Sequence, residues 1–303
     1  MRVFVLGGTG VAGRSTLPAL VAAGYIVTAH ARSGTAAGRL HDAGVSVASV
    51  DATDPTALRE ALRGQDVVIG HRVSIPPTFR AALSGAWRTF RYLRDEATAQ
   101  LVHAMFDVGV ERLIRDLVTF VYADAGEHWI DEDAPVAASG PMAANLVAER
   151  HIERLTTAGG ASVVLRCGMF DGPDDAMSVE TVRLARRGAA LFVGPGSSWH
   201  SALRTDDVGP AVTAALSAPS GVYNVVDDEP LRRADLLGLL ASSAKRSRLR
   251  RPAGFIVPLA SAAARVQARS QRVSTARFHE VTGWHPTVPS RRHGWPAAFE
   301  RIR

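Results

Sequence analysis

The stretch that decides the fold is Arg2-Val3-Phe4-Val5-Leu6-Gly7-Gly8-Thr9-Gly10-Val11-Ala12-Gly13. The apolar run Arg2–Leu6 predicts a buried strand, and Val11–Ala23 predicts the helix after it. Glycines between them permit a tight turn, close approach of the backbone to a pyrophosphate, and close helix–strand packing. A ligand-free glycine turn is the alternative, but the free N–H groups of the helix start favour a phosphate. The residues expected at this nucleotide site are Gly7, Thr9, Gly10, Val11, Ala12 and Gly13.

Short apolar runs alternate with amphipathic stretches through the first half of the chain. Such alternation is typical of parallel strands joined by right-handed helical crossovers. The expected strands are Arg2–Leu6, Tyr25–Ala29, Val45–Val50, Asp66–Gly70, Arg112–Val118 and Ser162–Arg166. The expected helices include Pro55–Leu62, Ala97–Val108 and Pro141–Thr156. The pattern predicts an α/β fold with a doubly wound parallel Rossmann sheet.

The pattern loosens after Arg166, where Gly- and Pro-rich turns become frequent. We expect a dinucleotide-binding Rossmann domain over residues 1–167 and a smaller C-terminal substrate lobe, mainly over residues 168–303. Residues from about 205 to 226 are expected to return to the sheet, with Gly221–Val225 as a strand. No composition shift marks a linker between the two parts.

Composition favours a folded, cytoplasmic protein. Of 303 residues, 47% are hydrophobic and 21% charged, and Cys167 is the single cysteine, which fits a reducing compartment. We recognise no leader and no long apolar span, so we expect no membrane contact. No His/Cys cluster has metal-ligand spacing, so no metal is expected.

The net charge of +6 includes the basic run Lys245–Arg251. Such a run can contact nucleic acid, but it is more often a solvated helix end or loop, and an arginine-rich composition also follows from a GC-rich genome. We therefore expect a small-molecule substrate and no nucleic-acid partner. The sequence does not predict the oligomeric state.

Three positions after the second, third and fourth strands bear on the cofactor. Arg32 stands where an NAD enzyme carries an acidic residue, and its planar fork suits the 2′-phosphate of NADPH, so we expect NADPH rather than NADH unless Arg32 is a plain surface residue. Asp51, with Ala52 beside it, is expected at the adenine, although Asp51 can instead cap the helix that begins near Pro55. His71 is expected near the nicotinamide ribose, where it can serve as a general acid, although a histidine hydrogen-bonded at a strand end is the favoured alternative.

The order of these motifs resembles that of the extended short-chain dehydrogenase/reductases. The resemblance takes in the glycine motif and Asp51, and it continues through Val121-Tyr122-Ala123, Arg204–Val208 and Gly283–Pro286. It implies the Rossmann fold and a nicotinamide dinucleotide as cofactor.

The catalytic residues of that family do not carry over. The family's Tyr-x-x-x-Lys motif supplies a proton through the tyrosine, while the lysine holds the ribose. Here Pro141 takes the tyrosine position and Asn145 the lysine position, so Asn145 is expected to bond the ribose without carrying a charge. The family's serine falls on Val118. No catalytic residue is certain, and the remaining candidates are Thr119, His71 and Asp116.

Aromatic residues gather in the unusual segment Ser74–Arg94 and again where the resemblance places the substrate crevice. These side chains either wall a flat substrate or pack as ordinary core. The candidate substrate contacts are Trp87, Phe90, Met169, Phe170, Trp199 and His200.

Two functions follow as hypotheses. The chain is similar in character to angucyclinone ketoreductases, which implies NADPH-dependent reduction of a ketone on a polycyclic aromatic polyketide. The missing tyrosine equally suits a non-enzymatic NAD(P)-binding sensor. An epimerase or dehydratase is less favoured, because those reactions use the tyrosine as base.

Overall fold

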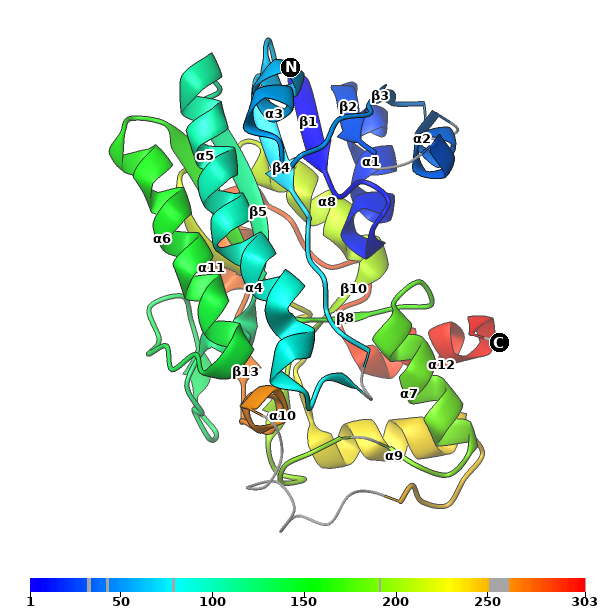
Figure 1. Cartoon of the computed structure of the whole chain (residues 1–303). Helices are drawn as coiled ribbons and strands as arrows, with labels where there is room; N and C mark the ends of the chain where they lie inside the picture. The colour runs from blue at the N-terminus through cyan, green and yellow to red at the C-terminus, as the bar shows by residue number, and fades with distance from the viewer. Residues whose placement is uncertain (32–33, 42–43, 78–79, 191, 251–261, 303) are drawn as a thin grey trace.

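A parallel sheet forms the centre of the computed structural model, which describes residues 1–31, 34–41, 44–77, 80–190, 192–250 and 262–302 (Figure 1). Within these residues the sheet has seven strands in the order β11-β7-β5-β4-β1-β2-β3. The strands are β1 (Arg2–Leu6), β2 (Ile26–His30), β3 (Ser46–Ala48), β4 (Val67–Gly70), β5 (Arg112–Val118), β7 (Ala161–Cys167) and β11 (Gly221–Val225). All their pairings are parallel, which confirms the doubly wound Rossmann sheet.

Helices cover both faces of the sheet (Figure 1). On one face lie α1 (Val11–Ala22), α2 (Gly34–His41) and α8 (Thr205–Ala215), and on the other α3 (Pro55–Leu62), α5 (Glu96–Val108) and α6 (Ala143–Thr157). Alternate residues of β1 serve the two cores: Val3 and Val5 pack under the first set, and Phe4 and Leu6 under the second. Burial on both sides explains why the strands read as continuous apolar runs.

Most of the expected elements are present, with small changes at their ends. Arg2–Leu6, Pro55–Leu62 and Arg112–Val118 are confirmed residue for residue. The strand expected over Gly221–Val225 does return to the sheet, where it pairs with β7. The helix expected to begin at Pro141 instead begins as a 3₁₀ turn, η4 (Gly140–Met142), and only then becomes α6.

The remaining elements lie mainly beyond the carboxyl ends of the strands, in the lower part of Figure 1. The helical ones are η2 (Ser84–Trp87), α4 (Arg88–Arg94), η3 (Thr119–Val121), α7 (Ala176–Arg186), α9 (Arg233–Ser243), α10 (Ala262–Gln267), α11 (Ala276–Thr282) and α12 (Arg291–Arg301). Short strand pairs join β8 (Met169–Asp171) to β10 (Ala202–Arg204), β9 (Trp199–His200) to β12 (Leu231–Arg232), and β6 (Trp129–Ile130) to β13 (Arg272–Val273). The division into two domains stays a prediction.

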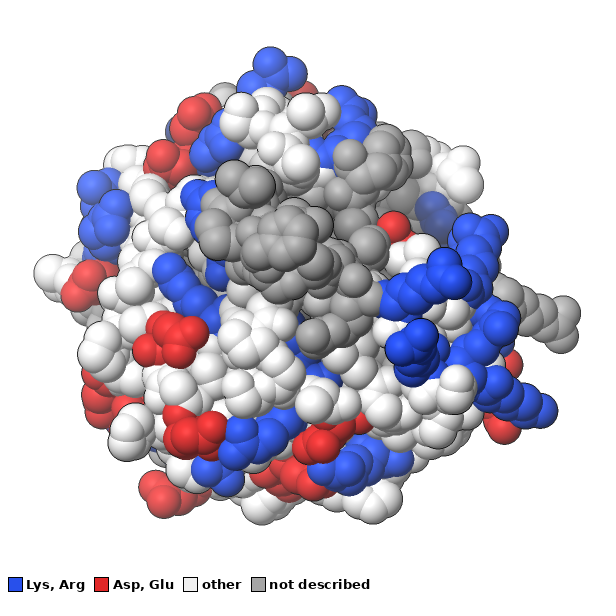
Figure 2. All heavy atoms as spheres, turned by 90° about the horizontal axis from the view of Figure 1, so that it is seen from below, with Lys and Arg blue, Asp and Glu red and all other residues white. Residues whose placement is uncertain are grey.

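The basic run after α9 is an exposed turn and loop as far as Arg250, and Arg251 lies outside the described residues. It runs beside the end of α7, because Arg250 forms a bridge with Ala189 and the Arg246 guanidinium donates to the Arg186 carbonyl. Figure 2 shows the molecule from below, and Lys and Arg side chains gather on one side of the face seen there. The described part of the basic run is therefore a solvated loop, one of the two structures expected for it.

A buried group of ionisable side chains attaches α12 to β8 and β9. The Arg291 guanidinium donates to an oxygen of Asp171 at 3.3 Å and lies 3.2 Å from His200 Nδ1. Burial lowers the pKa of His200 well below its ordinary value, so its ring is neutral. Asp227, buried close by, accepts a hydrogen bond from the Ala202 N–H, and burial raises its pKa to about 8. Asp227 is therefore a carboxylic acid that stays protonated at neutral pH.

Replacing Asp227 with Asn should stabilise the protein in mildly alkaline solution. Between the ordinary carboxyl pKa near 4 and the folded value of about 8, the unfolded chain loses this proton while the folded chain keeps it. The free energy of unfolding of the parent therefore falls as pH rises through that window. Asp227→Asn has no such proton, so it should exceed the parent by on the order of 5 kcal/mol at pH 8 and match it near pH 4.

Urea denaturation across this pH range measures the difference. The control is Asp174→Asn, at an exposed position, which should keep the slope of the parent. Equal pH slopes for Asp227→Asn and the parent would show that Asp227 is ionised in the folded protein.

Candidate nucleotide-binding site

The turn between β1 and α1 packs backbone against backbone. Gly7 has a φ of +88°, in the region that favours glycine, and a Cβ there would lie 2.9 Å from the His71 carbonyl carbon. A Cβ on Gly13 would lie 2.5 Å from the Gly7 oxygen. The Gly10 N–H donates to that same oxygen at 3.0 Å. Because these positions admit no side chain, the turn brings the start of α1 close to the carboxyl end of β1, an inner strand of the sheet.

The start of α1 has the features of an anion site. Gly10 is its N-cap residue and contributes no side-chain cap, so the N–H groups of the first turn keep their capacity for a phosphate. Thr9 and Val11 are partly exposed here, whereas Ala12 turns its methyl into the core. Arg14 fixes the turn by donating to the Thr9 carbonyl at 3.1 Å and the Asp174 carbonyl at 3.0 Å. A pyrophosphate therefore fits this turn.

Asp51 lies exposed after β3, where a bound adenine is expected. It accepts hydrogen bonds from the Thr53 hydroxyl and N–H, which lower its pKa. The cap of α3 is Asp54, which accepts from the Thr56 N–H at 2.9 Å, so the alternative role considered for Asp51 is wrong. Ala52 is buried in the core below.

The phosphate-recognition residue expected after β2, Arg32, lies outside the described residues. Its neighbour Ala31 continues the line of the strand, since its N–H donates to the Ala48 carbonyl at 3.1 Å. Preference for NADPH therefore stays a prediction.

His71 and Asp116 form a buried pair beside the glycine turn. His71 Nδ1 lies 2.9 Å from Asp116 Oδ1, and the side chains are 1% and 6% exposed. Burial opposes ionisation of Asp116, but the contact with His71 and the charges of Arg94 and Arg115 bring its pKa down to about 2. The ionised carboxylate therefore accepts the proton on Nδ1. His71 Nε2 is buried and has no hydrogen-bond partner among the described residues.

The adjacent charged residues Arg115 and Asp116 of β5 do not share a partner. Asp116 faces His71, whereas the Arg115 side chain packs against Gly70 and donates to the carbonyls of Arg72 and Leu93. Burial lowers the pKa of Arg115 to about 9. Arg115 thus fastens the chain after β4 to the end of α4.

The positions of the family's tyrosine and lysine lie at the start of α6. Pro141 is buried in η4, and Asn145 is fully buried in the first turn of the helix. The Asn145 amide donates to the Met142 carbonyl at 3.0 Å, and its Oδ1 has no hydrogen-bond partner among the described residues. Thr119 is buried at the start of η3. Asn145 therefore retains one acceptor atom that a ribose hydroxyl can use.

Tyr122, the tyrosine that follows β5, belongs to a structural network that the sequence did not reveal. Its hydroxyl donates to Asn224 Oδ1 and accepts from Arg166, both at 2.8 Å, and Arg166 also forms a two-point bond with Glu149. Burial raises the pKa of Tyr122 to about 12. Asn224 and Arg166 stand side by side in β11 and β7, a pairing visible only once the strand order is known.

The six expected substrate contacts fall into separate surroundings. Trp87 and Phe90 meet edge to face at 5.4 Å within an apolar cluster. The half-buried Phe170 packs on the sheet core, with Met169 beside it in β8. The Trp199 ring lies against two guanidinium groups, each 4.5 Å from its centroid, and its N–H donates to Glu127. His200 belongs to the buried group around Arg291.

Two further features follow from the described residues. They contain no group of three or more His, Cys, Asp or Glu side chains that could hold a metal ion. None of their helices has the length and hydrophobicity that crossing a bilayer requires.

Known relatives include two curated enzymes. A Streptomyces protein named 3-diazoavenalumate denitrifying reductase is 33% identical, over 97% of this chain and 99% of its own. A Stigmatella aurantiaca protein, 4-hydroxy-2-methyl-3-oxo-4-farnesyl-3,4-dihydroquinoline-1-oxide ketoreductase, is 28% identical over 79% of this chain and 72% of its own. Both names describe reductases of secondary metabolites rather than angucyclinone enzymes.

Solved structures share the fold at low identity. UDP-glucuronic acid 4-epimerase from Bacillus cereus with NAD superposes with a TM-score of 0.79 at 18% identity, covering 100% of this chain and 98% of the other. A human epimerase family protein with NADPH gives 0.80 at 20% identity, covering 100% and 99%.

The family model described as NAD(P)H-binding matches residues 7–187, from the glycine turn to the end of α7. The chain therefore belongs to the NAD(P)H-binding family, as an atypical member of the oxidoreductases that resemble short-chain dehydrogenase/reductases.

Proposed function

We propose that this protein transfers hydride from NADPH to an electron-poor aromatic secondary metabolite, in a reaction that takes no proton from a tyrosine. The observation that carries the proposal is the start of α6, where the family's tyrosine and lysine are Pro141 and Asn145. A positioned acid typically contributes about 10²–10⁴-fold to such a reduction. A substrate that needs no such acid makes the loss tolerable.

A peri-hydroxylated ketone on a polycyclic aromatic polyketide, as in the angucyclinones, is the first substrate that meets this condition. Its phenol donates an internal hydrogen bond to the carbonyl, and the ring spreads the incoming negative charge. The protein then needs only to orient the ketone against the nicotinamide, which raises the effective concentration of the reacting groups, and to exclude water from the site. The Stigmatella relative, a ketoreductase by name, supports a ketone as acceptor.

An aromatic diazo group is the second candidate, favoured by the full-length Streptomyces relative. An aryl diazonium ion that takes up one hydride gives the arene and dinitrogen. One C–N bond breaks, one C–H bond forms, and the positive charge is cancelled without any added proton. This acceptor removes the need for the tyrosine altogether. Both candidates share an aromatic substrate and differ in the group reduced.

The chain's own residues have separate tasks in this proposal. NADPH, when bound, supplies the hydride. The glycine turn and the start of α1 hold its pyrophosphate, Arg32 its 2′-phosphate, and Asp51 its adenine. Asn145 Oδ1 accepts a hydrogen bond from a hydroxyl of the nicotinamide ribose. His71, Thr119 and Asp116 stay weak candidates for acid–base chemistry, since each is buried.

The test of the function is NADPH oxidation with matched aromatic substrates. We expect turnover with a 1-hydroxyanthraquinone-type ketone, or with an ortho-diazophenol and release of one dinitrogen per NADPH. Methylating the hydroxyl of the ketone should slow turnover far more than it weakens binding, because the internal hydrogen bond is lost. A protein that binds NADPH yet oxidises it with neither panel is a sensor, and the proposal fails.

The protein should bind NADPH more tightly than NADH. A charged hydrogen bond to the 2′-phosphate contributes on the order of 1.5–3 kcal/mol, or roughly 10- to 150-fold in affinity. Dissociation constants for both cofactors, measured by calorimetry, should show this preference in the parent and lose it in Arg32→Ala. Arg39→Ala, a neighbouring exposed arginine in α2, is the control and should keep it. A parent protein without preference contradicts the role of Arg32.

Asn145→Ala should raise the dissociation constant of NADPH by about fivefold to tenfold, the effect of one hydrogen bond. The turnover number at saturating NADPH should change little, because Asn145 moves no proton. Pro141→Ala is the matched variant one turn earlier, and it should leave both quantities within about threefold. A collapse of turnover in a folded Pro141→Ala protein would mean that this position does more than start the helix.

A further inference from the structure

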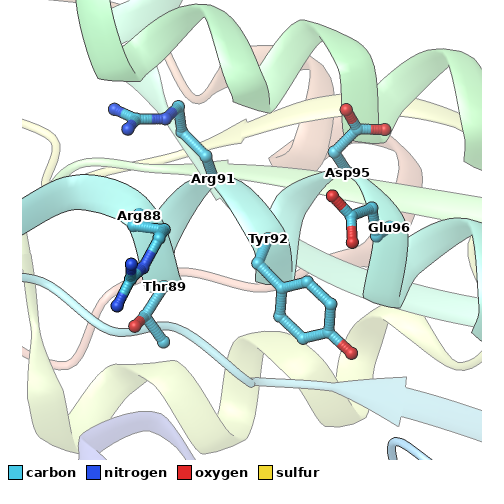
Figure 3. A pocket seen from close by; sticks show the side chains of 6 residues that line it. All are labelled: Arg88, Thr89, Arg91, Tyr92, Asp95 and Glu96. Atoms are coloured by element: carbon cyan, nitrogen blue, oxygen red, sulfur yellow. The ribbon is translucent and has the colours of Figure 1, made fainter. Parts of the chain in front are cut away.

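The outer face of α4 borders a cavity of about 550 Å³, a size typical of small-molecule sites. Its lining residues are Arg88, Thr89, Arg91, Tyr92, Asp95 and Glu96. Figure 3 shows the arginines and Thr89 toward one end, Asp95 and Glu96 toward the other, and the Tyr92 ring between them. The cavity is therefore cationic at one end and anionic at the other.

A second cavity of about 290 Å³ shares Arg88 and Thr89 with the first, so the two cavities adjoin at these residues, and together they are called the groove. Its other lining residues are Ser74, Ile75, Pro76, Pro77, Arg80, Gly85 and Ala86. The stretch 74–77 comes four residues after the carboxyl end of β4, which is the neighbour of β1 in the sheet. Ser74 is therefore three residues after His71, whose backbone packs against Gly7 of the nucleotide turn.

Three large hydrophobic side chains on the segment from 73 to 83 are exposed. Val73, Ile75 and Leu83 are 39%, 53% and 59% exposed, and Ile75 is the one that lines the groove. Ile75, with Pro76 and Pro77 beside it, supplies the apolar wall of the groove.

The cations at the junction of the two cavities have little to neutralise them. The Arg88 and Arg80 side chains make no hydrogen bond or ion pair among the described contacts, and Arg91 reaches only the Ser84 carbonyl, at 3.4 Å. At the anionic end, by contrast, Asp95 is bonded to His151 at 2.8 Å. Arg88 lines both cavities, so it is the cation best placed for a ligand that spans them.

We propose that this groove binds the carboxylate of an aromatic acid, with Arg88 as the anchor and the ring against Ile75–Pro77. A guanidinium fork matches a carboxylate through two parallel hydrogen bonds, and the apolar wall suits a flat ring. The inference rests on the proposed function and deepens it, because it makes the substrate of the reductase an aromatic carboxylate. Arg88 is then a specificity-determining residue, and the hydride acceptor lies at the opposite end of the substrate.

The experiment measures binding alone, in the full chain saturated with NADPH. The probes are 2-naphthoate and its uncharged counterpart 2-naphthamide, titrated by calorimetry. We expect the carboxylate to bind at least about tenfold tighter than the amide, as one charged hydrogen bond requires. Arg88→Gln should remove this preference, and Arg88→Lys should keep part of it. Arg248→Gln, at an exposed cation far along the chain, should keep all of it.

The proposal is overturned if naphthoate and naphthamide bind equally, if neither binds, or if Arg88→Gln retains the preference. NADPH affinity, measured on the same proteins, should be the same in Arg88→Gln and the parent, because Arg88 is assigned to the substrate alone. Since no turnover is involved, a sensor that reduces nothing can still give the expected result. Failure of this site and failure of the proposed function are therefore separate outcomes.

Discussion

The structure depends on how closely backbone can approach backbone where β1 enters α1. Gly13 lies directly over the oxygens of the turn, and Gly7 lies over the carbonyl of His71, so neither position has room for a Cβ. This contact places the start of α1 at the carboxyl end of β1 and leaves the N–H groups of its first turn available to a ligand. The same principle joins the last third of the chain to the sheet, because Gly209 of α8 packs on α1 and donates to the Ser15 hydroxyl at 2.8 Å.

Beyond that turn, the residues expected to bind the dinucleotide differ from the charged residues close to them. The elements that hold a dinucleotide are present, whereas the charges nearest to it are turned inward. Asp116 pairs with His71, and the guanidinium groups of Arg94 and Arg115 donate to main-chain carbonyls. These buried contacts organise the carboxyl ends of β4 and β5.

Local signals in the sequence were sufficient for the framework. Glycine spacing identified the nucleotide turn, and apolar runs identified β1 and β5, because turn geometry and burial on two faces act through neighbouring residues. Contacts between distant segments were beyond such signals. The sheet register brings Asp116 to His71, and the cations around Trp199 come from β12 and β13. Even the choice of Asp54 over Asp51 as a cap depended on the precise start of α3.

The start of α6 also bears on how the chain can evolve. Gly140 has a φ of +56°, and a Cβ there would lie 2.5 Å from the Ala262 methyl, while Pro141 and Asn145 are buried. A lysine at position 145 would place an ammonium group where the asparagine is fully enclosed, at a cost of several kcal/mol unless a carboxylate arrived with it. A tyrosine at position 141 would need room from its neighbours. Introducing the family's tyrosine and lysine here therefore requires compensating substitutions in the residues that enclose these two positions.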